Sequence, residues 1–182
     1  MQKYIALLRG INVSSQKIMP MNDLKQLFEE SGFQNVQTYI QSGNVIFDSN
    51  TSTPSELAEA IKNSIRKKFG FEVNILIRTP DEFRKIISEN PFLNDYGKDT
   101  ERMYVTFLAE EPVADRISSL QDNPFNPEEI HYGHKVIYLY SPNGYGRAKL
   151  NNNFLESRLK VKATTRKWKT VKKLLELASS NT

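Results

Sequence analysis

The loop from residue 9 to residue 19 gathers polar side chains directly after an apolar stretch, residues 4–8. The Arg9 guanidinium could grip a carboxylate or phosphate with two parallel hydrogen bonds, and the Asn12 amide could both donate and accept. Lys17 adds a cation, which could move protons if burial lowered its pKa. In the alternative interpretation, Arg9 pairs with a neighbouring acid and Asn12 closes a turn. The sequence leaves both interpretations open.

A second group of candidate residues is cationic. Residues 141–182, the basic segment, contain ten Lys or Arg against Glu156 and Glu176, a net charge of +8 that leaves −4 for residues 1–140. Such a segment can attract phosphate-bearing partners, or it can form a solvated helix face. Its candidate ligand-binding residues are Arg147, Lys149, Arg166 and Trp168, and the other cations on which binding would rest are Arg158, Lys160, Lys162, Lys167 and Lys169.

Trp168 itself has two interpretations. It begins an apolar helix face that continues through Val171, Leu174 and Ala178, which predicts a residue that anchors the core. Its indole could also stack on a base or sugar at the start of that helix, where the first N–H groups favour an anion.

Many kinds of chemistry are excluded. The chain has no cysteine, which removes disulfides, thiolate metal sites and cysteine nucleophiles. The sequence contains no P-loop, HExxH motif or nucleophile elbow, and Gly144-Tyr145-Gly146 alone indicates a flexible turn. His131 and His134 flank a predicted hairpin turn and, without an evident third metal ligand, are predicted to pair across it at the surface. We expect no metal and no cofactor.

The elements that position these residues follow one plan in the first half of the chain. Residues 4–8 are apolar on both faces and predict a buried strand. The predicted elements after it are a helix from Pro20 to about Glu30, hairpin strands at 36–40 and 45–47, a helix between the cap Thr53 and the terminal Gly70, a strand at 71–77 and a further helix from Pro80.

The second half repeats this order. Its predicted elements are a strand at 103–108, a helix from Pro112, a hairpin around Gly133, a helix from about Asn151, a short strand near Val161 and a final helix. The repeated spacing indicates an internal duplication. We therefore predict an α+β fold of two ferredoxin-like βαββαβ halves in tandem, each followed by an extra helix. The predicted domains are residues 1–79 and 101–182, joined by a helix and loop at residues 80–100.

Three segments read YIALLRGINV at residues 4–13, YIQSGNV at residues 39–45 and ATTR at residues 163–166. They resemble the signatures of a bacterial family known as domain of unknown function 1697. The resemblance implies no activity and no catalytic residues. Two positions depart from the family's pattern: Ser14-Ser15 stand where a Gly-Gly pair is expected, and Lys167-Trp168-Lys169 stand where Asn-Trp-Asn usually follows ATTR. The first departure weakens any argument for an anion nest built from glycines.

Two classes of function remain after these exclusions. The first prediction is a binding module for a phosphate-bearing ligand or nucleic acid, acting through the basic segment. Recognition on the sheet itself is disfavoured because residues 44–48 lack the RNP1 pattern of RNA-recognition domains. The alternative is a small-molecule enzyme, whose site would lie between the loop from Arg9 to Lys17 and the region from Arg147 to Trp168. An adaptor for other proteins would leave no signature here.

The apolar pattern also bears on location. Residues 4–8 form too short an apolar run for a signal peptide or a membrane span, and the mean hydropathy of the chain is −0.54. We therefore expect a cytoplasmic protein without a membrane partner. The sequence leaves the oligomeric state open.

Overall fold

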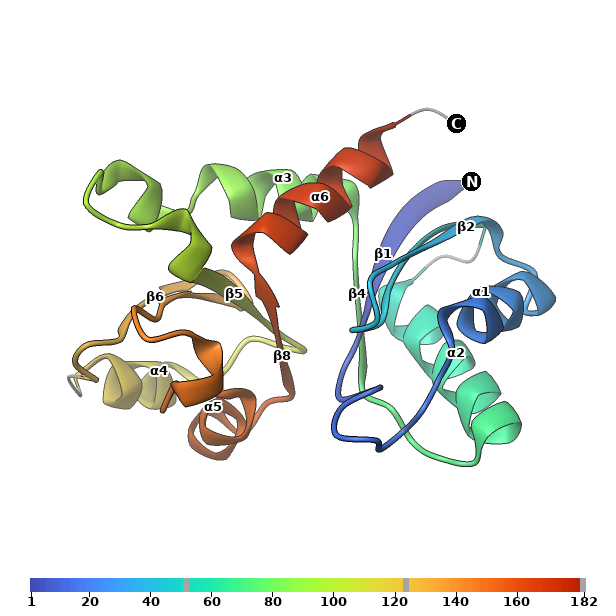
Figure 1. Ribbon diagram of the computed structural model, residues 1–182, viewed down its shortest axis with the longest axis horizontal. Coiled ribbons are helices and arrows are strands. Elements are labelled where there is room, and N and C mark those ends of the chain that lie inside the picture. The colour runs from blue at the N-terminus through green and yellow to red at the C-terminus, as the bar shows by residue number, and fades with distance from the viewer. Residues whose placement is uncertain (51–52, 123–124, 181–182) are drawn as a thin grey trace. The chain divides into compact units, whose positions relative to one another are not determined.

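The computed structural model describes residues 1–50, 53–122 and 125–180 (Figure 1). The chain forms two compact units. The first unit contains residues 1–83 together with the chain from Leu174 onward, and the second contains residues 84–173. The predicted division into domains at 1–79, 80–100 and 101–182 stays a prediction.

The first unit is built on a four-stranded antiparallel sheet in the order β2-β3-β1-β4. Its elements are β1 (Gln2–Leu8), α1 (Met21–Glu30), β2 (Gln34–Tyr39), β3 (Asn44–Ser49), α2 (Pro54–Phe69) and β4 (Ile75–Arg78). This βαββαβ order is the connectivity of the ferredoxin-like split arrangement. Tyr4 and Leu8 face one side of the sheet and Ile5 and Leu7 the other, and all four are buried, as predicted for this strand.

The core of the first unit lies between this sheet and its two helices. Figure 1 shows α1 and α2 on the same side of the sheet. The buried residues of α1 are Leu24, Leu27 and Phe28, and those of α2 are Leu57, Ile61 and Ile65. Phe28 meets the ring of Phe47 from β3 edge to face, with 5.2 Å between ring centroids.

The ends of α2 follow from its sequence. Thr53 accepts a hydrogen bond from the backbone N–H of Glu56, Pro54 occupies the first turn, and Gly70 ends the helix at φ 78°, so the predicted caps are confirmed. The strand predicted at residues 71–77 begins only at Ile75. Residues 75–78 pair with β1, whereas Phe71 packs beside Phe69 against the core.

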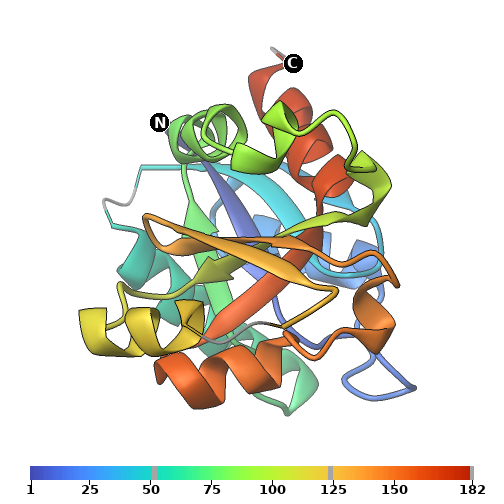
Figure 2. The same cartoon turned by 90° about the vertical axis from the view of Figure 1, so that its left-hand side faces the viewer.

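The second unit repeats the arrangement with the strand order β6-β7-β5-β8. Its elements are η1 (Pro91–Asn94), η2 (Thr100–Arg102), β5 (Met103–Leu108), α4 (Ala114–Gln121), β6 (Glu129–Gly133), β7 (Val136–Tyr140), η3 (Tyr145–Arg147), α5 (Asn152–Leu159) and β8 (Ala163–Lys167). In Figure 2, the yellow α4 and the orange-red α5 lie side by side beneath this sheet, and the two helices are in contact. The three short 3-10 helices were not predicted from the sequence.

An α-helix follows the fourth strand of each sheet, α3 (Pro80–Ser88) after β4 and α6 (Trp168–Ser179) after β8. The pairing registers of the two sheets also correspond. Ile5 lies opposite Arg78 in the first sheet, and Val105 lies opposite Arg166 in the second. The predicted α+β fold of tandem halves, each followed by an extra helix, is confirmed. An origin by duplication stays a prediction.

Candidate functional site

Four of the exposed cations of the basic segment flank α5 (Asn152–Leu159) in the second unit. Arg147 ends η3, Lys149 lies in the loop after it, and Lys160 and Lys162 lie between α5 and β8. Lys160 ends α5 in the left-handed conformation at φ 60°, which turns the chain sharply toward β8. Within the described part of the chain, none of the four side chains forms an ion pair. Among the residues that the structure describes, no carboxylate therefore neutralises their charges.

Other cations of the basic segment are neutralised or buried. Lys167 Nζ lies 2.6 Å from a carboxylate oxygen of Glu101, and Lys169 Nζ lies 3.6 Å from the same oxygen. These contacts hold the pKa of Glu101 below its usual range, with the Lys167 hydrogen bond as the largest cause. The basic segment thus divides into exposed cations without a carboxylate partner and cations already engaged within the fold.

Glu128 positions the loop that carries Lys149. Its buried carboxylate accepts hydrogen bonds from the backbone N–H groups of Lys149 at 2.8 Å and Leu150 at 3.0 Å. Leu150 is fully buried, and the next residue, Asn151, caps α5 by accepting from the N–H of Phe154. The buried carboxylate of Glu128 therefore fixes the backbone of the loop at residues 149–150.

A cluster of hydroxyl groups lies beside this loop. The Thr165 hydroxyl contacts the Thr106 hydroxyl at 2.7 Å and donates to the side-chain amide oxygen Oδ1 of Asn152 at 2.8 Å. The Tyr145 hydroxyl donates to Thr165 and accepts from the N–H of Asn152 at the start of α5. Asn152 and Thr106 were not predicted as site residues. The signal for Asn152 was the run of three asparagines at residues 151–153, of which one suffices for the helix cap.

Arg166 and Trp168 are both buried. Arg166 donates to the Thr164 hydroxyl at 3.0 Å and the Thr165 carbonyl at 3.1 Å, and burial lowers the pKa of its guanidinium to about 10. Trp168 is 2% exposed and begins α6. Ligand contact by either residue stays a prediction, and either side chain would have to become exposed before it could meet a ligand.

The polar loop of the first unit is held by Asn12. Its side-chain amide donates to the carbonyls of Met19 at 2.9 Å and Gln41 at 3.0 Å, and its oxygen accepts from the N–H of Met19 at 2.7 Å. The loop therefore closes on itself and on the β2–β3 hairpin. Two of the three segments that carry the family resemblance meet at this point. The geometry matches the interpretation in which Asn12 closes a turn.

Arg9 begins the same loop, directly after β1, and Lys17 lies near the end of the loop. Arg9 is half-buried and its backbone N–H donates to the carbonyl of Asn74. The exposed Lys17 donates from Nζ to the carbonyl of Glu72 at 2.7 Å. Asn12, Ser14, Ser15 and Lys17 all have positive φ, between 47° and 60°. Glycine would adopt this conformation without strain, so the backbone at positions 14 and 15 would suit the Gly-Gly pair that the resemblance led us to expect there.

Replacement of Asn12 by alanine is expected to lower the free energy of unfolding by about 2 kcal/mol, because three hydrogen bonds disappear at once. Urea denaturation followed by circular dichroism measures the change. Asn12→Asp is the matched variant, since it keeps the acceptor for Met19 and loses the two donors. An Asn12→Ala protein as stable as the parent would show that Asn12 does not close the loop.

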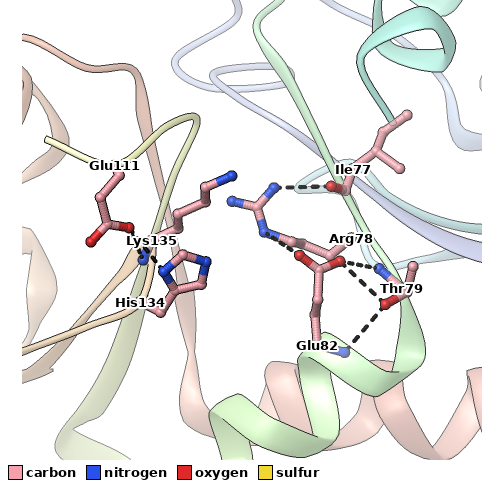
Figure 3. A network of polar contacts seen from close by, with 7 residues as sticks. All are labelled: Ile77, Arg78, Thr79, Glu82, Glu111, His134 and Lys135. Atoms are coloured by element: carbon pink, nitrogen blue, oxygen red, sulfur yellow. Dashed lines mark hydrogen bonds and ion pairs between the residues drawn. The ribbon is translucent and has the colours of Figure 1, made fainter. Parts of the chain in front are cut away.

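A buried arginine also lies on the first unit, shown on the right of Figure 3. The Arg78 guanidinium donates to the carbonyl of Ile77 at 3.0 Å and lies 3.6 Å from a carboxylate oxygen of Glu82. Burial lowers the pKa of Arg78, and Glu82 partly opposes this effect. Glu82 also accepts from the N–H of Thr79, while the Thr79 hydroxyl accepts from the N–H of Glu82, and the two hydrogen bonds form a capping box at the start of α3.

The two histidines are in the second unit and have different partners. His134, on the left of Figure 3, lies 3.1 Å from a carboxylate oxygen of Glu111, which also accepts from the N–H of Lys135. His131 lies in β6 with its ring against Phe92. The prediction that the two histidines pair across the turn is wrong. Among residues 1–50, 53–122 and 125–180, no three His, Asp or Glu side chains cluster closely enough to hold a metal ion.

The helices of the described chain are also relevant to the membrane question. No helix among the described residues is both long enough and apolar enough to span a bilayer.

The comparisons with known proteins agree with this architecture. The structure is similar to that of the conserved bacterial protein SP0830 from Streptococcus pneumoniae, with a TM-score of 0.77 and 23% sequence identity. The alignment covers 97% of this chain and 98% of that protein's chain. At this identity the similarity shows a shared fold. Residues 1–138 match the family described as protein of unknown function (DUF1697), and the chain belongs to this family. No curated protein matches the sequence. The basic segment lies beyond the matched residues.

Proposed function

We propose that the second unit binds phosphate-bearing ligands, single-stranded nucleic acid included, through Arg147, Lys149, Lys160 and Lys162. The observation that carries this proposal is the contrast between these four exposed cations and the neighbouring Lys167 and Lys169. The latter two share the carboxylate of Glu101, whereas the four have no ion-pair partner in the described chain. Phosphate groups would supply the missing negative charge.

The physical basis of such binding is the release of counterions from the nucleic acid. Each phosphate neutralised on a single strand makes the logarithm of affinity fall with the logarithm of salt concentration by about 0.7. Four contacts therefore predict a slope of about −3. A flexible strand can follow the path from η3 around the end of α5 without a preformed groove, so the proposal requires no base-specific contact.

Fluorescence anisotropy with a short single-stranded RNA over a salt series tests the proposal. In the triple variant Lys149→Gln, Lys160→Gln, Lys162→Gln, only one of the four cations remains, and the slope is expected to shrink to about −0.7. The matched control is Lys25→Gln, Lys62→Gln, Lys67→Gln, which removes the same charge from the first unit. The control is expected to keep the slope of the parent.

Two results would contradict the proposal. If the parent chain does not bind the RNA at low salt, the exposed cations are a solvated face. If both triple variants weaken binding equally, the effect comes from net charge and not from the basic segment. The enzyme alternative, with a site between the loop from Arg9 to Lys17 and the region from Arg147 to Trp168, stays a prediction.

A further inference from the structure

A groove between α4 and α5 in the second unit has a composition that no sequence motif indicated. Its volume is about 580 Å³, which lies in the range of small-molecule sites. Side chains of α4, α5 and the chain before β6 line it, among them Arg116, Arg158, Phe125 and Phe154. It therefore combines two guanidinium groups with two aromatic rings, whereas the cations of the proposed RNA path come from outside it.

The two guanidinium groups are available to an anion. Arg116 donates one hydrogen bond, at 3.3 Å, to the carbonyl of Arg158 in the last turn of α5, and a guanidinium has five N–H donors. The guanidinium carbon of Arg158 lies 5.2 Å from the centre of the Phe154 ring. Both side chains are exposed, and neither forms an ion pair within the described residues. A phosphate between them would receive charge-assisted hydrogen bonds from both.

The aromatic side of the groove can take a planar group. Phe125 and Phe154 meet at 81° with 5.6 Å between their ring centroids, and both rings are half-buried. The buried Leu120 and the exposed Val113 extend this apolar surface. A heteroaromatic ring that binds here would contact these apolar side chains and lose its contact with water.

We propose that this groove binds a nucleoside monophosphate. The phosphate lies between Arg116 and Arg158, and the base packs against Phe125 and Phe154. Asp115, which also lines the groove, can accept hydrogen bonds from ribose hydroxyls. The inference deepens the proposed function, because it names a ligand class and a location for phosphate binding by the second unit, and it rests on that function.

A purely structural role makes a different prediction. Arg116 would then only bind the C-terminal carbonyl of α5, where a cation interacts favourably with the helix dipole, and Arg158 would only cover Phe154. Replacement of either arginine would lower thermal stability and leave ligand binding to the folded protein unchanged. The test therefore needs both a melting temperature and an affinity for each variant.

Isothermal titration calorimetry of the full chain with adenosine 5′-monophosphate (AMP) at low salt measures the affinity. Arg116→Gln and Arg158→Gln are each expected to weaken AMP binding at least about tenfold, because each removes charged hydrogen bonds to phosphate. Arg66→Gln is the matched control, since it removes the same charge from an exposed position on α2 of the first unit, and it is expected to bind AMP as the parent does. Adenosine and inorganic phosphate, titrated separately, are each expected to bind at least about tenfold more weakly than AMP.

Arg116→Lys keeps the positive charge and provides a second variant if Arg116→Gln folds poorly. It is expected to bind AMP more weakly than the parent, because lysine cannot form the two parallel hydrogen bonds of a guanidinium. Failure of the parent to bind AMP, or equal affinity in the parent, Arg116→Gln and Arg158→Gln, would overturn the inference.

The RNA titration separates this inference from the proposed function. If the triple lysine variant loses RNA binding but keeps the AMP affinity of the parent, both proposals are supported and occupy separate sites. If the protein binds RNA through the lysines but does not bind AMP, only the proposal of an AMP site in the groove is overturned. If the protein binds AMP through the arginines but does not bind RNA, the AMP site in the groove is supported. Nucleic-acid binding is then excluded from the proposed function.

Discussion

Replacement of Gly43 by alanine is expected to lower the free energy of unfolding by about 3 kcal/mol. Gly43 lies in the turn between β2 and β3 at φ 79°, where a residue with a Cβ atom costs about 1–2 kcal/mol. An added Cβ would also lie 2.7 Å from Cδ1 of Ile11 and 2.9 Å from Cβ of Leu8. Both neighbours are buried, so they cannot move without repacking the core, which adds about 1–3 kcal/mol.

Gly70 provides the matched control for this substitution. Its φ is 78°, nearly the same as that of Gly43, but no heavy atom lies within 4 Å of the position of an added Cβ. Gly70→Ala should therefore show only the backbone cost, about 1–2 kcal/mol. Urea denaturation of the two variants in parallel isolates the steric part. Equal losses would show that Ile11 and Leu8 yield easily and that Gly43 is needed only for its left-handed backbone.

The second large effect is expected at Glu128. In Glu128→Ala, the backbone N–H groups of Lys149 and Leu150 lose their acceptor, and the N–H of Leu150 lies in a part of the loop that is buried. Each unsatisfied buried donor costs about 1–3 kcal/mol, so the free energy of unfolding should fall by about 3 kcal/mol. Glu128→Gln keeps an acceptor oxygen for one of the two N–H groups and should lose about half of that amount.

Glu129 is the control for Glu128, because it is the adjacent acid with a different environment. Its carboxylate is about half exposed and pairs with Lys98 at 2.6 Å, where the hydrogen bond raises the pKa of Lys98. Lys98 keeps Asp95 as a partner at 3.4 Å when Glu129 is removed, so Glu129→Ala should unfold almost as the parent does. Similar stabilities for Glu128→Ala and Glu129→Ala would mean that the loop at residues 149–150 does not depend on Glu128.

The elements of the fold could be predicted where the signals were local. Thr53 and Glu56, like Thr79 and Glu82, lie three residues apart and specify their helix starts without reference to the rest of the chain. The strand at residues 103–108 is apolar except for Thr106, and the structure gives it the predicted bounds. Such features depend on nearby residues, which is why sequence reasoning found them.

The candidate sites depended on partners far away in the sequence. Glu128 binds backbone groups 21 and 22 residues further along, and nothing beside it distinguishes it from Glu129. Arg116 meets the carbonyl of Arg158 across 42 residues, so neither sequence spacing nor composition indicated a groove. In the same way, the sequence singled out Asn12 as a polar residue of the loop, but its hydrogen bond to Gln41 could be found only from the fold.

The first compact unit is discontinuous in sequence, and this has a consequence for synthesis on the ribosome. Residues 1–83 belong with the chain from Leu174 onward, whereas the second unit is the uninterrupted stretch 84–173. Leu174 and Ala178 are both buried, so the first unit lacks part of its packing until these residues have been translated. Although its strands are made first, the first unit is the last to be completed, and its nascent form must persist while the whole of the second unit emerges.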